Sequence, residues 1–229
     1  MKSVKMLSIA VALFGITVIS SAQTLQDVAD AYNKASELLS QGDFDGVITE
    51  LEKCVELAKK VGTDEAEEIG VNAEMNLPGY YLAKADKLNK AKDFPATLKA
   101  LEATVAAAEK YKNASAKESA EKVIPQVYLA LGKADYAAKK FEEAIQNLDQ
   151  VIALDPALAE PYFIRGASYQ QLKDELKMDE SYRLAIEKGT ASGAAAITQN
   201  AQNQLSRYYL NVGITAQKAK KWDEAITAF

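Results

Sequence analysis

One helical hairpin pattern recurs along most of the chain, and it limits the possible folds more than any other feature. In residues 125–158, two amphipathic segments flank a tight turn just before Phe141. Apolar residues of the second segment recur every three or four positions, which is typical of one face of an α-helix. The turn residue Phe141 has four counterparts at corresponding positions, namely Phe44, Phe94, Glu175 and Trp222.

Two further columns support this register. Nine positions before the turn residue stand only small residues, Ala35, Ala85, Gly132, Gly166 and Gly213. Seven positions after it stand large ones, Leu51, Leu101, Leu148, Tyr182 and Phe229. Small residues on facing stripes allow two helix axes to approach closely. A single hairpin cannot bury both of its faces, so the columns predict an all-α array of stacked hairpins. Its rows cover about residues 24–61, 62–111, 112–156, 157–189 and 194–229.

The spacing between rows predicts that some first helices are elongated. The turn residues are separated by 50, 47, 34 and 47 positions. Relative to the shortest separation, the extra residues of the other three fall in 62–77, 112–124 and 189–205, which are rich in Ala, Glu and Gln. Pro78 and Pro125 then either bend a long helix or end a short extra one, and we favour the bent helix. Gly189 and Gly193 predict a flexible joint after a helix that ends near Lys188.

The order aromatic, Leu-Gly, turn aromatic, Ala and terminal Asp-Pro in residues 125–158 resembles the tetratricopeptide repeat (TPR). Residues 24–229 follow the pattern with departures: Lys34 and Lys84 stand where the motif has leucine, and Glu175 replaces the turn aromatic. The resemblance implies a right-handed α-solenoid of TPR-like hairpins. It also implies a protein that binds partners and has no catalytic activity of its own.

Residues 1–22 have the pattern of a secretory signal peptide. Lys2 and Lys5 precede an apolar run of 14 residues, and Ser20-Ser21-Ala22 supplies small residues for cleavage before Gln23. A spanning helix needs about 20 apolar residues, so a retained membrane anchor is the less favoured alternative. We therefore expect export to the periplasm or beyond, similar to exported bacterial TPR proteins, with only indirect membrane contact.

Charge and composition argue against several functions. Without residues 1–22, the chain has 25 basic and 32 acidic residues. The mature chain is therefore mildly acidic and unsuited to binding nucleic acid. The chain contains no histidine, which excludes histidine-dependent catalysis and most catalytic zinc sites. It also contains no phosphate-binding glycine loop. We expect no enzyme activity, no cofactor and no metal, and we expect Cys54 to be a buried, inert thiol.

The resemblance implies a concave groove lined by the first helices of successive hairpins. Carried over by register, the groove residues are Leu82, Asn89, Leu129, Lys133, Tyr136, Phe163, Gln170, Leu210 and Gln217. Such a surface suits an extended peptide or a partner helix, with Tyr136 and Phe163 as anchors. The alternative is that some of these residues only pack against the next repeat.

The sequence therefore predicts a protein–protein interaction scaffold in the bacterial cell envelope. A second possibility is a regulatory or targeting module of a longer protein that continues after Phe229 into an enzymatic or outer-membrane part. A carrier of lipid or another small ligand is a third, less favoured because an open array seldom encloses an apolar cavity.

Overall fold

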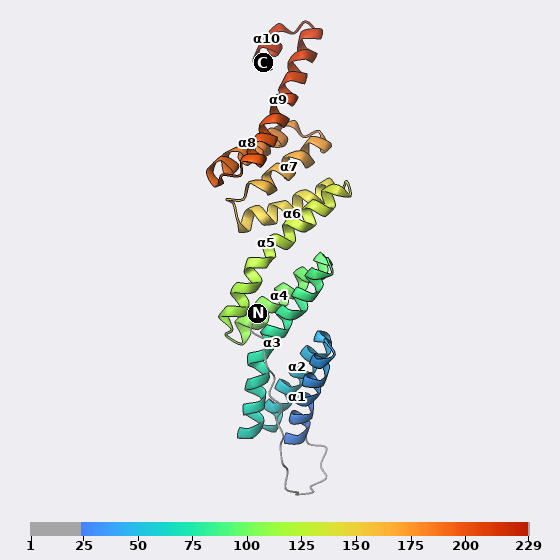
Figure 1. The fold of residues 1–229 in the computed structure, drawn as a ribbon, viewed down its shortest axis with the longest axis vertical. Coiled ribbons are helices and arrows are strands. Elements are labelled where there is room, and N and C mark those ends of the chain that lie inside the picture. Colours follow the sequence, from blue (N-terminus) through green and yellow to red (C-terminus); the bar gives the residue numbers. More distant parts are fainter. Residues whose placement is uncertain (1–23, 229) are drawn as a thin grey trace. The chain divides into compact units, whose positions relative to one another are not determined.

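The computed structural model describes residues 24–228, and these residues form helices joined by short connections (Figure 1). The ten helices of this part are α1 (Leu25–Ser40), α2 (Phe44–Val61), α3 (Asp64–Lys90), α4 (Phe94–Lys110), α5 (Ala114–Ala137), α6 (Phe141–Leu154), α7 (Ala159–Leu172), α8 (Glu175–Ser192), α9 (Ala195–Lys218) and α10 (Trp222–Ala228). The predicted all-α fold is confirmed. The predicted signal peptide lies outside the described residues.

The chain divides into two compact units. Unit 1 extends to Ile124 and unit 2 begins at Pro125. In unit 1, α1 packs on α2, α2 on α3 and α3 on α4, while α1 also contacts α3. In unit 2, α6 packs on α7, α7 on α8, α8 on α9 and α9 on α10, while α7 also contacts α9. Each unit is thus a stack of sequential hairpins, as expected for a TPR solenoid.

The turn inside each hairpin has the same backbone geometry. One residue adopts a left-handed conformation, and its N–H donates to the carbonyl three positions earlier. The next N–H donates to the carbonyl five positions earlier, as Lys140 N does to Asp135 O at 2.8 Å. This pair of hydrogen bonds is the Schellman motif, which ends helices by satisfying their last carbonyls. The left-handed residues are Gly42, Lys92, Lys139, Lys173 and Lys220.

An aspartate begins the second helix in three of the hairpins. Asp43, Asp93 and Asp174 are N-cap residues, and each carboxylate accepts a hydrogen bond from the backbone N–H three positions later. Such a cap stabilises a helix by about 1 kcal/mol. The Schellman motif and the aspartate cap together explain why so few residues reverse the chain direction.

The small-residue column lies where the helices of a hairpin cross. A Cβ atom added at Gly132 would come within 2.9 Å of the Leu148 side chain on α6. At Gly166 it would come within 2.9 Å of the Tyr182 ring on α8. Ala35 and Ala85 are fully buried, and Gly213 is buried as well. At Gly132 and Gly166 the column therefore sets the close approach of first and second helices, as its position predicted.

The long first helices are confirmed, and neither proline interrupts its helix. Pro78 lies inside the 27-residue α3, and Pro125 lies inside the 24-residue α5. The alternative of a short extra helix followed by a break is therefore wrong.

The predicted helix end near Lys188 is also wrong, because α8 continues to Ser192 and ends at the left-handed Gly193. Gly189 is instead a packing position. A Cβ atom there would lie 2.4 Å from Thr198 Oγ1 of α9, so the missing side chain permits the contact between α8 and α9.

Within residues 24–228, no helix combines the length and the apolar character that a membrane span requires.

Candidate partner-binding surface

All nine predicted groove residues lie on the first helix of a hairpin. Leu82 and Asn89 lie on α3 in unit 1 and are half-buried. The other seven lie in unit 2, on α5 (Leu129, Lys133, Tyr136), α7 (Phe163, Gln170) and α9 (Leu210, Gln217). These seven residues belong to one compact unit, so their positions can be compared with one another.

Three of the seven gather around Tyr182 of α8, which is almost fully buried. The Phe163 ring packs against the Tyr182 ring with 5.7 Å between centroids. The Tyr182 hydroxyl donates to Gln170 Oε1 at 3.0 Å. Burial raises the pKa of Tyr182, and nearby Tyr136 raises it further. Tyr182 thus contacts Phe163 and Gln170 of α7 directly and lies near Tyr136 of α5.

Tyr136 and Lys133 also contact neighbouring elements. The Tyr136 ring meets Phe141 edge-on, with centroids 5.7 Å apart and planes inclined by 61°. Lys133 Nζ lies 2.6 Å from Glu160 Oε1, which joins α5 to α7. The lysine predicted as a groove cation therefore belongs to an ion pair on the surface of unit 2.

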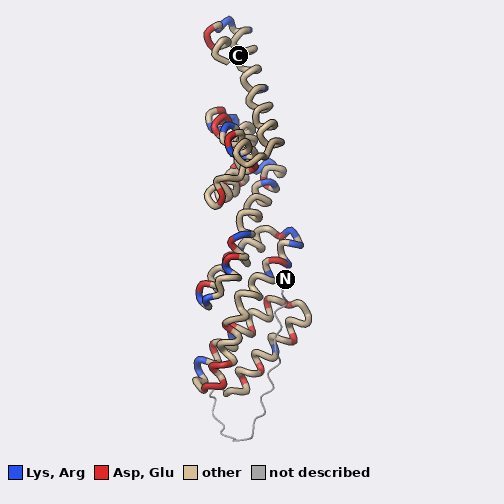
Figure 2. Tube along the Cα trace, turned by 60° about the vertical axis from the view of Figure 1, so that its left-hand side comes forward, with Lys and Arg blue, Asp and Glu red and all other residues tan. Residues whose placement is uncertain are grey.

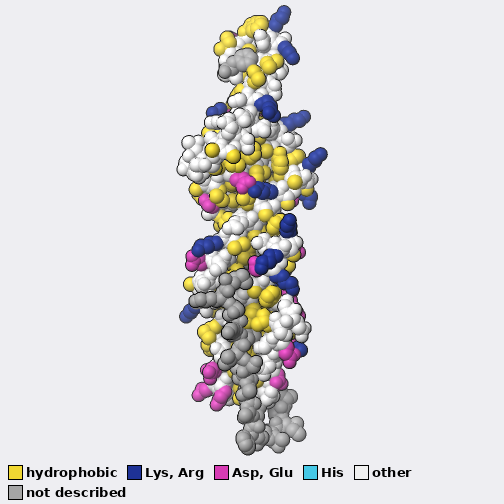
Figure 3. All heavy atoms as spheres, viewed as in Figure 1, with side chains coloured by type: hydrophobic (Ala, Val, Ile, Leu, Met, Phe, Trp, Pro, Cys, Tyr) yellow, Lys and Arg dark blue, Asp and Glu magenta, His cyan; other side chains and the backbone are white. Residues whose placement is uncertain are grey.

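The remaining residues of the set differ in exposure. Leu129 is half-buried on α5, whereas Leu210 and Gln217 are exposed on α9. Leu210 exposes 51 % of its surface. Figure 3 shows apolar side chains at the surface of both units.

The structure gives Tyr136, Phe163 and Gln170 a packing role within unit 2. All three are only half-buried, so each also presents part of its surface to solvent. Packing against a rigid neighbour fixes a side chain in one orientation, which lowers the entropy lost when a partner binds. A packing role and a binding role are therefore compatible at these positions.

Two polar networks of unit 2 were not foreseen from the sequence. Arg165 of α7 pairs with Asp149 of α6 at 2.8 Å and donates to Ser181 of α8 at 3.2 Å. On the next interface, the Tyr209 hydroxyl of α9 donates to Asp179 of α8 at 2.7 Å. In the sequence, only the scarcity of arginine in a lysine-rich chain distinguishes Arg165, the centre of the first network.

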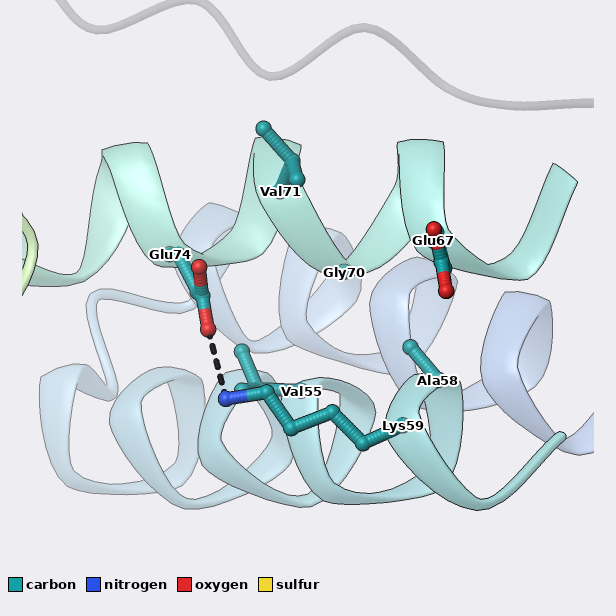
Figure 4. Close-up of a pocket in the computed structure, with 7 residues that line it drawn as sticks. All are labelled: Val55, Ala58, Lys59, Glu67, Gly70, Val71 and Glu74. Atoms are coloured by element: carbon teal, nitrogen blue, oxygen red, sulfur yellow. Dashed lines mark hydrogen bonds and ion pairs between the residues drawn. The ribbon is translucent and has the colours of Figure 1, made fainter. Parts of the chain in front are cut away.

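A shallow depression of about 200 Å³ lies between α2 and α3 in unit 1 (Figure 4). Lys59 and Glu74 face each other at one end, with Nζ and Oε1 2.8 Å apart, and Glu67 lies at the other end. Val71 points away from α2. The ion pair satisfies the charges of Lys59 and Glu74, so the depression lacks converging free polar groups.

The chemistry available to the described residues is limited. Burial raises the pKa of the Cys54 thiol to about 12, so this group is not a thiolate at neutral pH. Residues 24–228 hold no cluster of three or more acidic or cysteine side chains placed to bind a metal ion. What these residues offer is a surface of aromatic, amide and aliphatic side chains.

Two models of repeat families agree with this architecture. No curated protein matches the chain. Matching solved structures include one titled "Crystal structure of MamA", with 19 % identity, a TM-score of 0.33, and coverage of 85 % of this chain and 90 % of that one. Another, "Crystal structure of MamA protein", has 18 % identity, a TM-score of 0.32, and coverage of 89 % and 88 %. A family model for "TPR repeat" matches residues 132–173, and one for "Tetratricopeptide repeat" matches residues 31–61. Two segments of the chain, one in each unit, therefore match models of the tetratricopeptide repeat.

Proposed function

We propose that the protein is a non-catalytic scaffold that holds a protein or peptide partner against the first helices of unit 2. Tetratricopeptide repeats typically bind proteins and have no catalytic activity, which supports this class of function. The main supporting observation is the group formed by Tyr136, Phe163 and Gln170 around Tyr182. Half-buried aromatic residues held in place by neighbours are typical anchors of a protein interface.

The chemistry of this surface favours a partner segment with alternating apolar and polar groups. Phe163 and Leu129 offer apolar contact, and Gln170 and Gln217 offer amides for main-chain hydrogen bonds. An extended peptide or one face of a helix presents such a mixture.

A pull-down from cell-envelope extract of the source organism tests the proposal. We expect the wild-type chain to recover a partner that Tyr136→Ala plus Phe163→Ala loses. Because both residues also pack inside unit 2, the variant is first compared with wild type by circular dichroism. Leu210→Glu serves as a second variant, since Leu210 is half-exposed and its replacement leaves the core intact.

Phe44→Ala is the matched control, because it removes a half-buried aromatic residue from a hairpin of unit 1. It should recover the partner normally. Equal recovery by wild type, the double variant and Leu210→Glu would reject the proposed surface.

We further propose that the scaffold acts in the cell envelope after export. The support is the sequence of residues 1–22, with two lysines, an apolar run and small residues before Gln23. Mass spectrometry of the protein from its native source should find Gln23 as the first residue. A mature chain that begins at Met1 would contradict export by cleavage.

A further inference from the structure

The hairpin turns place lysine at a backbone position that normally favours glycine. Lys92, Lys139, Lys173 and Lys220 have φ between 60° and 62°. Side chains other than glycine are strained there because Cβ approaches the backbone. In the first hairpin the same position is Gly42, with φ of 70° and open space around it. The turn geometry therefore does not itself require lysine.

These lysines also lack ion-pair partners among the described residues. None of the left-handed lysines lies within 4.0 Å of a carboxylate oxygen in residues 24–228. Most other lysines of this part are paired, as Lys59 is with Glu74 and Lys133 with Glu160. The lack of ion-pair partners does not reflect a shortage of acidic residues, which outnumber basic ones in the chain, 32 to 27.

Helix electrostatics explain only part of this pattern. A cation at the C-terminal end of a helix interacts favourably with the helix dipole, which accounts for lysine near these turns. A lysine one helical turn earlier, where the backbone angles are ordinary, would also interact favourably with the helix dipole. The dipole therefore does not account for lysine at the strained position in successive hairpins.

Unit 2 contains three of these residues, Lys139, Lys173 and Lys220, which we call the turn lysines. They follow α5, α7 and α9, the helices that also hold the proposed binding residues. All three side chains are exposed. Figure 2 shows basic residues around the hairpin turns, and in Figure 3 dark-blue side chains project from the right-hand edge of unit 2. On that edge Figure 1 draws the turns after α5 and α7.

We infer that the turn lysines of unit 2 form a docking edge for an acidic protein segment. The lysines are separated by one hairpin each, and carboxylates such as Glu142 and Asp174 lie between them in sequence. Carboxylates spaced along a protein segment can each pair with one lysine and still lie away from Glu142 and Asp174. An anionic membrane instead attracts dense lysine clusters and repels a chain with an acidic net charge. The edge is distinct from the nine groove residues, and the inference does not rest on them.

The test uses poly-L-glutamate as the acidic probe and the full chain with Lys139→Gly, Lys173→Gly and Lys220→Gly combined. Glycine suits the left-handed turn, so the melting temperature should equal or exceed that of wild type. We expect wild type to bind the probe in low salt and to release it as salt is raised. The triple variant should bind at least about tenfold more weakly, because each lost cation removes one charge contact.

A charge-matched control is Lys34→Gln, Lys53→Gln and Lys60→Gln, which removes three lysines that are ion-paired on the surface of unit 1. It should bind the probe as wild type does, and so should the groove variant Tyr136→Ala plus Phe163→Ala. The inference is overturned if wild type does not bind, if the turn variant binds equally well, or if the control loses as much affinity. Binding to phosphatidylglycerol vesicles without binding to poly-L-glutamate would also overturn it, in favour of a membrane.

Discussion

Gly166 determines how closely α7 and α8 can pack. A Cβ atom at this position would lie 2.9 Å from Tyr182 Cδ1 and 3.0 Å from Cε1. The Tyr182 ring is almost fully buried and holds Gln170 through its hydroxyl, so it has little freedom to move away. The glycine is therefore part of the same arrangement that orients the proposed binding residues.

We expect Gly166→Ala to destabilise the protein. Alanine gains about 1 kcal/mol in helix propensity over glycine. Overpacking a rigid core costs about 1–3 kcal/mol, so a net loss of about 1 kcal/mol is expected from urea unfolding. A variant as stable as wild type would show that Tyr182 moves freely, and would weaken the view of this site as preorganised.

Cys54 offers a second test at the scale of a single residue. Its side chain is fully buried in the core of unit 1, and burial alone raises its pKa to about 12. The thiol therefore stays protonated up to strongly alkaline pH. Iodoacetamide at pH 8 should leave Cys54 unmodified in the native protein and should label it within minutes in 6 M guanidinium, as measured by mass spectrometry. Rapid labelling of the native protein would contradict the burial.

At the scale of helices, the contact between α8 and α9 contains a partly buried carboxylate. Burial of Asp179 on its own would raise its pKa, but hydrogen bonds from Arg183 and Tyr209 outweigh this effect, so the pKa lies below its usual 3.8. A lowered pKa means that the ionised carboxylate stabilises the folded state above pH 3.8, and that this contribution is lost as the pH falls further.

Tyr209→Phe should therefore destabilise the protein in a pH-dependent way. Removing the donor that lies 2.7 Å from Asp179 Oδ1 should cost about 1.5–3 kcal/mol at pH 7, the range for hydrogen bonds to charged groups. The loss should be smaller at pH 3, below the ordinary pKa of 3.8, because the ionised form of Asp179 contributes less to stability there. Tyr208→Phe is the control, because its partner Glu175 is exposed and solvent weakens the contact. Equal losses at both pH values would exclude the ionised carboxylate as the cause.

The helices show which features a sequence pattern can predict. Gly132 and Gly166 stand at fixed positions within the repeat, and both lie at helix crossings. Gly189 lies outside that register, and a glycine near a helix end resembles a stop signal. Its contact with Thr198 depends on the angle between α8 and α9, which no local pattern specifies.

The positions of the nine predicted groove residues were foreseen in the same partial way. Register placed all nine residues on first helices, because a repeat fixes which helix a position belongs to. It did not predict that Lys133 pairs with Glu160 or that Tyr182 joins Phe163 and Gln170. Such contacts join different helices, so they depend on how successive hairpins stack.

At the scale of the whole molecule, the two units have separate cores. The core of unit 1 includes Val28, Leu51 and Leu77, and that of unit 2 includes Met178, Tyr182 and Leu205. In repeat proteins each hairpin contacts only its neighbours, so stability is a sum of local terms. A destabilising substitution in the core of one unit should therefore promote unfolding mainly in that unit.

Leu51→Ala tests this expectation, because Leu51 is fully buried and the substitution leaves a cavity that costs about 2–5 kcal/mol. Hydrogen–deuterium exchange followed by mass spectrometry should show faster exchange in α1–α4 and little change in α7–α9, since amides report the opening of their own region. Met178→Ala, at an equally buried position of unit 2, should give the opposite pattern. If either variant accelerates exchange uniformly from α1 to α9, the chain unfolds as one cooperative block. The proposed partner-binding residues would then depend on the core of unit 1 as much as on their own.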